Sequence, residues 1–148
     1  RFLEGMKISS RDNGRTPMQW DTTMNSGFST GKPWLPVNAN YTGVNVAAQD
    51  KDPGSILNYF RKMTKLRKES EVLIYGKFTL VDESNPDVFA YTRELNGKKM
   101  LVLLNFSSRP VKANTGLNLA KATVLINNYP AASTDGTLKP YEAIIYEL

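Results

Sequence analysis

The residues best suited to chemistry lie together in one short polar segment, Ser10–Asp21, whose letters are SRDNGRTPMQWD. The segment places two guanidinium groups, two carboxylates and two side-chain amides around the turn signal Asn13-Gly14. Arginine is a planar partner for carboxylates, and amides present donors and acceptors side by side, as a polyhydroxylated ligand requires. The spacing leaves two interpretations equally open: a site for such a ligand, or a structural network in which Arg11 and Arg15 pair with nearby acids.

The chain contains no cysteine and no histidine among its 148 residues. These absences exclude a disulfide, a thiolate zinc site, a cysteine nucleophile and a Ser-His-Asp triad. No stretch approaches the roughly 18 apolar residues of a membrane span, and no cluster of oxygen ligands suited to calcium stands out. We therefore expect no cofactor, no metal and no membrane partner. The lack of cysteine also favours a cytoplasmic protein.

The formal net charge of +5 and the isoelectric point near 9.4 are features shared with nucleic-acid-binding proteins. The basic residues are densest within a single predicted helix, at Arg61, Lys62, Lys65, Arg67 and Lys68. A solvated helix face explains such a cluster without any partner. We expect no nucleic-acid partner.

The first 50 residues are rich in turn formers and poor in periodic pattern, which predicts a long irregular segment. Scattered aromatic residues, among them Trp20, Phe28 and Trp34, make disorder a poor explanation. They predict a loop packed onto a larger body. Trp20 and Trp34 have flat faces on which a sugar can stack, but packing beneath the loop is the favoured interpretation.

One helix is expected over residues 53–69. Asp52 has the character of an N-cap, and Pro53 suits the first helical position. The apolar residues that follow recur with a period of 3.6 and predict one buried stripe: Ile56, Tyr59, Phe60, Met63 and Leu66.

From residue 72 onward the pattern changes to short β-branched and aromatic runs separated by turns. Asn96-Gly97 is a strong signal for a two-residue hairpin, and the apolar run before residue 106 predicts a strand buried on both faces. The expected strands are Val72–Val81, Val88–Arg93, Lys99–Phe106, Arg109–Ala113, Ala122–Asn127, Gly136–Leu138 and Glu142–Glu147. Such spacing is typical of an antiparallel β-sandwich. The aromatic residues expected in its core are Tyr75, Phe78, Phe89, Tyr91, Phe106 and Tyr146, and no site is evident on the sandwich.

The two halves differ in whether they can bury their own apolar surface. A sandwich over residues 72–148 can stand alone, whereas one helix and a fifty-residue loop leave their apolar side chains without a partner. We therefore expect residues 1–71 to be a piece of a larger domain.

The string SRDNGRTPMQWD, followed by NSGFSTGKPWLPVN, resembles the oligo-1,6-glucosidase and α-glucosidase branch of glycoside hydrolase family 13. The similarity continues in order through SILNYFRKMTKLRKES to the terminal LKPYEAIIYEL, so it covers essentially the whole chain. It implies an α/β plus all-β architecture. Residues 1–71 would be the last part of a (β/α)8 TIM barrel, with an active-site loop and the final helix, and residues 72–148 an antiparallel β-sandwich C-terminal domain.

The resemblance also implies retaining glycoside hydrolysis by an Asp nucleophile and a Glu acid/base about 5–5.5 Å apart. In the family these carboxylates precede the segment that this chain contains, and no acid here matches their motifs. Asp12 and Asp21 are expected to be structural, so the chain has no catalytic residue of its own. The expected parent is an exo-acting α-glucosidase that cleaves α-1,6 or α-1,4 bonds of short gluco-oligosaccharides, and the segment alone is expected to be inactive.

By the same resemblance, Arg15 matches the family's arginine on the loop after the final barrel strand, which helps to bind the terminal glucose. Arg15 is therefore the predicted substrate-binding residue. Arg11, Asn13 and Gln19 are expected to support the loop. The expected partners are the gluco-oligosaccharide substrate and the remainder of the catalytic barrel.

Three alternatives stay open. Trehalose-6-phosphate hydrolases and sucrose isomerases of the same family share this motif, although isomerases tend to have Phe where this chain has Met18, which favours a hydrolase. A β-sandwich also permits a non-catalytic carbohydrate-binding module, because fold does not fix function.

Overall fold

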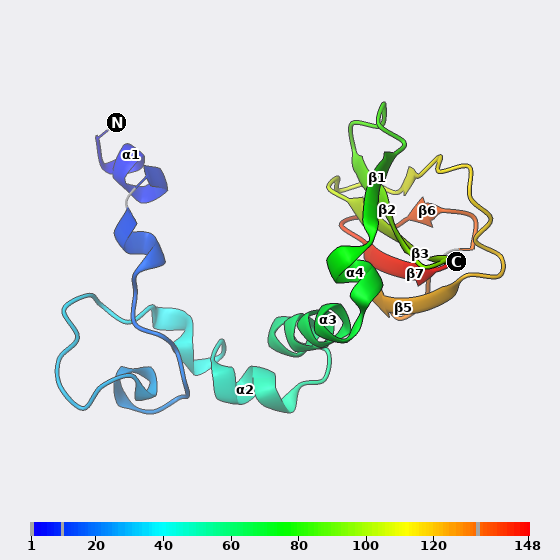
Figure 1. The fold of residues 1–148 in the computed structure, drawn as a ribbon. Helices are drawn as coiled ribbons and strands as arrows, with labels where there is room; N and C mark the ends of the chain where they lie inside the picture. Colours follow the sequence, from blue (N-terminus) through cyan, green and yellow to red (C-terminus); the bar gives the residue numbers. More distant parts are fainter. Residues whose placement is uncertain (1, 10, 133) are drawn as a thin grey trace. The chain divides into compact units, whose positions relative to one another are not determined.

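The computed structural model describes residues 2–9, 11–132 and 134–148. In chain order its helices and strands are α1 (Phe2–Ser9), α2 (Val46–Lys51), α3 (Ile56–Glu69), α4 (Glu71–Tyr75), β1 (Lys77–Val81), β2 (Val88–Leu95), β3 (Lys98–Asn105), β4 (Val111–Lys112), β5 (Thr123–Asn127), β6 (Thr137–Leu138) and β7 (Ala143–Glu147) (Figure 1). The chain divides into two compact units, Arg1–Phe60 and Arg61–Leu148. The division falls within α3, before the predicted domain boundary at residue 71, which stays a prediction.

The first unit is largely irregular between α1 and α2, as the turn formers predict. Three short 3-10 helices interrupt it, at Arg11–Gly14, Met24–Gly27 and Ala39–Thr42. The helices α1 and α2 were not expected. A local signal for α2 exists, because the side chain of Asn45 accepts a hydrogen bond from the Ala48 amide at 2.8 Å and so caps the helix N-terminus.

The helix α3 begins at Ile56, so the predicted start at Pro53 and the predicted N-cap Asp52 are wrong. Asp52 instead forms a turn, in which its Oδ1 accepts from the Gly54 amide at 2.9 Å and its carbonyl accepts from the Ser55 amide at 3.0 Å. The hydroxyl of Ser55 then accepts from the Asn58 amide at 3.2 Å. A hydroxyl in this position is an equally good cap, and the intervening turn delays the helix by three residues.

The predicted strand Val72–Val81 is wrong over its first half, which forms α4. The Ser70 hydroxyl caps α4 by accepting from the Leu73 amide at 3.3 Å, and the helix stops at Gly76. A Cβ at Gly76 would lie 2.4 Å from the Val72 carbonyl oxygen, so only glycine fits this close approach. The Ser70 cap and the Gly76 stop therefore favour a short helix here, although the β-branched composition favours a strand.

The remaining predicted strands are present, with shorter bounds at several ends. Four of them join β1 in a five-stranded antiparallel sheet with the order β1-β2-β3-β7-β5, and β4 pairs with β6 in a second sheet. The β2–β3 hairpin turns at Asn96-Gly97, where both residues have positive φ and Leu95 pairs with Lys98. The predicted antiparallel two-sheet domain is therefore confirmed.

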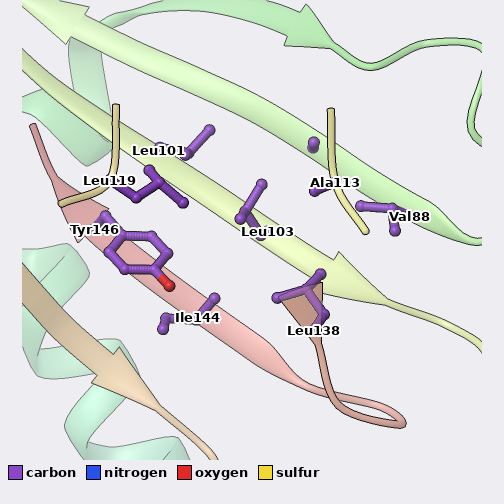
Figure 2. Close-up of a cluster of buried hydrophobic side chains, with 9 residues drawn as sticks. Val88, Leu101, Leu103, Ala113, Leu119, Leu138, Ile144 and Tyr146 are labelled. Carbon is purple, nitrogen blue, oxygen red and sulfur yellow. The ribbon is translucent and has the colours of Figure 1, made fainter. Parts of the chain in front are cut away.

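The core of the second unit lies between these two sheets. Figure 2 shows Leu103 and Ile144 of the larger sheet beside Leu138 of β6, with Ala113 and Leu119 from the connecting segments completing the cluster. The middle of β3 is buried on both faces, as its apolar run predicts. Fully burying a leucine side chain contributes about 1.5–3 kcal/mol, so this cluster is a main source of stability for the second unit.

Most of the aromatic residues expected in this core lie elsewhere. Tyr146 is buried, whereas Tyr75, Phe78, Phe89 and Phe106 are exposed and Tyr91 is half-buried. Alternate residues of a strand face opposite sides of the sheet, and the buried face of β2 carries the smaller residues Val88 and Ala90. Phe89 and Tyr91 therefore lie on the other face.

None of the helices in the described part of the chain is both long enough and apolar enough to cross a bilayer.

Candidate functional site

The polar segment that contains Arg15 lies in the first unit, where a single 3-10 turn spans Arg11–Gly14. The Arg15 amide closes this turn by donating to the Asp12 carbonyl oxygen at 3.0 Å. The side chains of Arg11, Asp12 and Arg15 are all exposed. Among the described residues neither arginine forms an ion pair with an acid, so the structural network considered from the spacing is not observed there. The side chain of Asn13 lies outside the described atoms.

Gln19 supports the loop, as predicted for it. Its Nε2 donates to Asn40 Oδ1 at 3.0 Å and also to the Val44 carbonyl oxygen. Its own carbonyl accepts from the Val46 amide at 2.9 Å, at the first residue of α2. The side chain and the backbone carbonyl of Gln19 thereby connect the polar segment to residues 40–46. The side-chain amide of Gln19 donates its hydrogen bonds within the loop.

Asp21 organises the next turn. Its Oδ1 accepts from the Thr23 amide at 2.8 Å and from the Thr23 hydroxyl, and these hydrogen bonds hold the pKa of the Asp21 carboxyl below its usual value. Gly27 has a φ of +68°, and a Cβ there would lie 2.8 Å from the Asp21 carboxylate oxygens. This carboxylate has a structural role, as predicted.

The buried residue Ser26 connects two segments of this loop through backbone hydrogen bonds. The carbonyl oxygen of Ser26 accepts from the amides of Trp20 and Asp21, at 2.9 and 3.2 Å. Asn25, Ser26 and Gly27 all have positive φ, a run that non-glycine residues adopt only where the surroundings hold them. Asn25 supplies such support, because its Nδ2 donates to the Ser29 and Gly31 carbonyl oxygens, each at 2.9 Å.

The described residues leave both tryptophans exposed to different degrees. Trp20 is about half exposed and Trp34 is 81% exposed. The packing beneath the loop that the sequence predicts is therefore not made by the described residues. The predicted buried stripe of α3 is only partly covered: Ile56 is 84% exposed and Phe60 and Met63 are also exposed, whereas Tyr59 and Leu66 are half-buried. Both observations agree with the expectation that the first part of the chain packs on a body outside it.

Among the described residues, no three His, Cys, Asp or Glu side chains lie close enough together to hold a metal ion. What the polar segment offers is an exposed guanidinium, Arg15, on a loop whose backbone is fixed by Gln19 and Asp21. An exposed guanidinium can donate to a hydroxyl or a carboxylate of a ligand. The role of Arg15 stays a prediction.

Sequence reasoning missed one feature of the second unit, a pocket on the outer face of the five-stranded sheet. Phe78, Phe89 and Tyr91 line it, together with Met63 and Arg67 of α3. The signal that could have found it is the parity of β2, where the aromatic residues alternate with the small residues of the core.

Known protein families and individual relatives match both units of this chain. The family profile described as alpha amylase, catalytic domain, matches residues 2–76, and the profile described as maltogenic amylase, C-terminal domain, matches residues 78–145. The oligo-1,6-glucosidase of Bacillus cereus is 39% identical over 100% of this chain. The trehalose-6-phosphate hydrolase of Bacillus subtilis is 38% identical over 97% of this chain.

Solved structures agree with these sequence matches. The trehalulose synthase MutB, mutant A258V in complex with Tris, superimposes with a TM-score of 0.87 at 40% identity over 99% of this chain. The isomaltulose synthase PalI from Klebsiella superimposes with a TM-score of 0.88 at 36% identity, again over 99% of this chain. The chain spans only 27% of the length of each of these four relatives.

Proposed function

Because the chain belongs to the α-amylase family, glycoside hydrolase family 13, we propose that it forms the C-terminal portion of a retaining, exo-acting α-glucosidase. The proposed substrates are short gluco-oligosaccharides with α-1,6 or α-1,4 bonds. The observation that carries the proposal is the match of the whole chain, in order, to oligo-1,6-glucosidases. The uncovered apolar side chains of α3 and the loop support it, because they require a further body to pack against.

In this proposal the reaction is carried out by two carboxyl groups of the preceding polypeptide. Retaining glycosidases need one carboxylate as nucleophile and one carboxylic acid about 5–5.5 Å away. In this proposal neither carboxyl group comes from this chain. The Asp21 carboxylate, for example, accepts a hydrogen bond from the Thr23 amide within its own turn. Residues 1–148 alone therefore have no hydrolytic activity.

The role proposed for this chain in the site is to close the pocket around the terminal glucose. Active sites of (β/α)8 barrels are built from the loops at the C-terminal face of the strands. The loop that carries Arg15 would contribute its guanidinium to the sugar hydroxyls. Such a contact behind one glucose unit favours attack at chain ends. The remainder of the barrel and the oligosaccharide are thus the two proposed partners, and the cytoplasm is the proposed compartment.

The test is an assay of the whole protein beside residues 1–148 alone. The whole protein is expected to hydrolyse p-nitrophenyl α-glucoside and isomaltose, whereas the 148-residue chain gives no turnover above background. Turnover by the short chain would contradict the proposal. Failure of the whole protein to cleave any glucoside would also contradict the proposal. A non-catalytic carbohydrate-binding module would then be the remaining function for this chain.

A second candidate has direct support from the relatives. A trehalose-6-phosphate hydrolase, a trehalulose synthase and an isomaltulose synthase match the chain about as well as the oligo-1,6-glucosidases do. Trehalose 6-phosphate and sucrose are therefore included in the same assay. Preferred hydrolysis of trehalose 6-phosphate, or conversion of sucrose to an isomer, would replace the proposed substrate while leaving the family unchanged.

A further inference from the structure

The loop that follows Arg15 contains three consecutive residues in the left-handed region of the backbone. They are Asn25, Ser26 and Gly27, with φ of +53°, +55° and +68°. Glycine adopts this region freely and asparagine tolerates it, whereas it is unfavourable for serine. Strained residues of this kind persist only where their surroundings hold them, and they concentrate at functional sites. We call residues 25–27 the left-handed turn.

The left-handed turn is closely fitted to the segment that comes after the arginine. The carbonyl oxygen of Ser26, a fully buried residue, accepts from the amides of Trp20 and Asp21 at 2.9 and 3.2 Å. The Asp21 carboxylate is held by the Thr23 amide at 2.8 Å. It leaves no space for a side chain at Gly27, because a Cβ there would lie 2.8 Å from both carboxylate oxygens. A change in the turn therefore displaces the residues bonded to it.

The other side of the left-handed turn is fixed by Asn25. Its Nδ2 donates to the carbonyl oxygens of Ser29 and Gly31, each at 2.9 Å. A side-chain amide has two hydrogens to donate, and this pair of hydrogen bonds can use both of them. The turn is thus held from both sides by hydrogen bonds within the first unit.

The connection from this turn back to Arg15 is short and stiff. Pro17 is buried, and its ring fixes its own φ at about −65°. Thr16 precedes the proline, which restricts Thr16 to extended backbone. Gln19 is fixed by the hydrogen bond from its side chain to Asn40 at 3.0 Å. Few backbone torsions are therefore free between the arginine and the residues bonded to the left-handed turn.

We propose that the left-handed turn is a positioning device for substrate binding, and that Asn25 and Gly27 are its positioning residues. They act through the backbone and set the place of the loop that carries Arg15. The inference rests on the proposed function for the sugar that Arg15 contacts. A guanidinium on a loop held in advance loses less conformational entropy when it binds than one on a mobile loop, so the device strengthens binding.

The test compares two glycine substitutions in the whole protein. Gly27→Ala adds a methyl group against the Asp21 carboxylate and disrupts the left-handed turn. Gly116→Ala is the matched control: Gly116 has a φ of +70° and lies in the second unit, and apart from its chain neighbours no described atom lies within 4 Å of a Cβ there. Both substitutions strain the backbone alike. A third variant, Asn25→Gly, removes the side-chain donor and keeps the freedom to adopt positive φ.

Gly27→Ala is expected to lower kcat/KM for isomaltose by about tenfold, since a misplaced binding group loses its alignment with the substrate. Asn25→Gly is expected to cause a smaller loss, and Gly116→Ala is expected to leave kcat/KM nearly unchanged. Equal losses in Gly27→Ala and Gly116→Ala would overturn the proposal.

A double-mutant cycle shows whether the turn acts through the arginine. In the Arg15→Ala background, Gly27→Ala is expected to lower kcat/KM by less than about twofold, because substitutions that act through one contact are not additive. Fully additive losses would overturn the proposal. If Gly27→Ala does not fold, the same cycle with Asn25→Gly decides, with the same expected outcome.

Hydrogen exchange separates this inference from the proposed function. The amides of residues 18–21 are expected to exchange at least about tenfold faster in Gly27→Ala than in the parent, and no faster in Gly116→Ala. Unchanged exchange in Gly27→Ala would overturn the proposal whatever the activity. A whole protein whose loop amides respond as expected but which cleaves no glucoside would refute the proposed function, and would leave the anchoring of the Arg15 loop by the turn intact.

Discussion

The two compact units of the chain differ in what holds them together. The buried apolar core, as far as the described residues show, lies in the second unit, where Leu101 and Leu103 are fully buried between two sheets. The first unit is held by hydrogen bonds of its turns, such as Gln19 to Asn40, while Trp34 and Ile56 are left almost fully exposed. A unit that fixes its backbone locally but leaves its large apolar side chains uncovered is shaped to pack against something else.

The second unit also satisfies several of its buried polar groups internally, although Arg93 Nε is buried without a hydrogen-bond partner among the described residues. The carboxylate of Glu142, which is fully buried, accepts from the Lys139 amide at 2.7 Å and from Asn127 Nδ2 at 2.8 Å. The Nδ2 of Asn105 donates to two backbone carbonyl oxygens, those of Arg109 and Lys139, each at 2.8 Å. The second unit therefore buries an apolar core of its own, whereas the first unit leaves its large apolar side chains exposed.

The largest expected effect separates the two units by stability. Leu103→Ala opens a cavity between the sheets and is expected to lower the free energy of unfolding of the 148-residue chain by about 2–5 kcal/mol. Trp34→Ala removes a larger side chain but is expected to change it by less than about 0.5 kcal/mol, since the chain does not cover Trp34. Urea unfolding followed by circular dichroism measures both. A larger loss from Trp34→Ala would reverse the comparison.

The next effect separates the units by activity. Arg15→Ala in the whole protein is expected to lower kcat/KM for isomaltose by about tenfold to a hundredfold, because a charged hydrogen bond to the substrate is worth about 1.5–3 kcal/mol. Arg61→Ala, on α3, is the matched control and is expected to leave kcat/KM nearly unchanged.

Arg11→Ala completes this experiment, because Arg11 is the first residue of the 3-10 turn that precedes Arg15, and both arginines are exposed. A smaller loss than in Arg15→Ala is expected. A larger loss would move the substrate contact to Arg11, and equal kinetics for Arg15→Ala and Arg61→Ala would remove Arg15 from the site.

The smallest effect concerns the pH dependence of the loop. The pKa of Asp21 is lowered by its hydrogen bonds to Thr23, so the ionised carboxylate stabilises the folded loop. This contribution is present above the unfolded pKa, near 3.9, and is lost as the pH falls through the lower folded pKa. An NMR titration is expected to show Asp21 ionising below that value, and Thr23→Val is expected to bring its pKa back up. A normal pKa in the parent would contradict the turn described here.

Where the sequence predicted the fold correctly, the deciding interactions are short in range. The hairpin turn needs two residues that tolerate positive φ, and the sequence Asn96-Gly97 provides them. The continuous apolar run of β3 predicts that both of its faces are buried. The errors at Asp52 and at residues 72–75 are also local, since Ser55 and Ser70 offer competing caps of the same quality.

The sequence alone does not predict which face of each strand or helix is covered by other residues. Phe89 and Ala90 are neighbours on one strand, and composition suggests that the larger one is buried, whereas the second sheet covers the smaller. In the proposed site, the position of the Arg15 guanidinium relative to the sugar would likewise depend on polypeptide outside this chain. The resemblance supplies the family in both cases, and the residue contacts depend on atoms outside this chain.

Hydrogen exchange of the backbone tests the central comparison most directly, in the whole protein and in residues 1–148 alone. Amides of the first-unit loop, such as Trp20 and Val46, are expected to exchange at least about tenfold more slowly in the whole protein, whereas amides of β3 exchange equally slowly in both. Loop amides that are equally protected in the short chain would show that the first unit needs no further body, and would contradict the account.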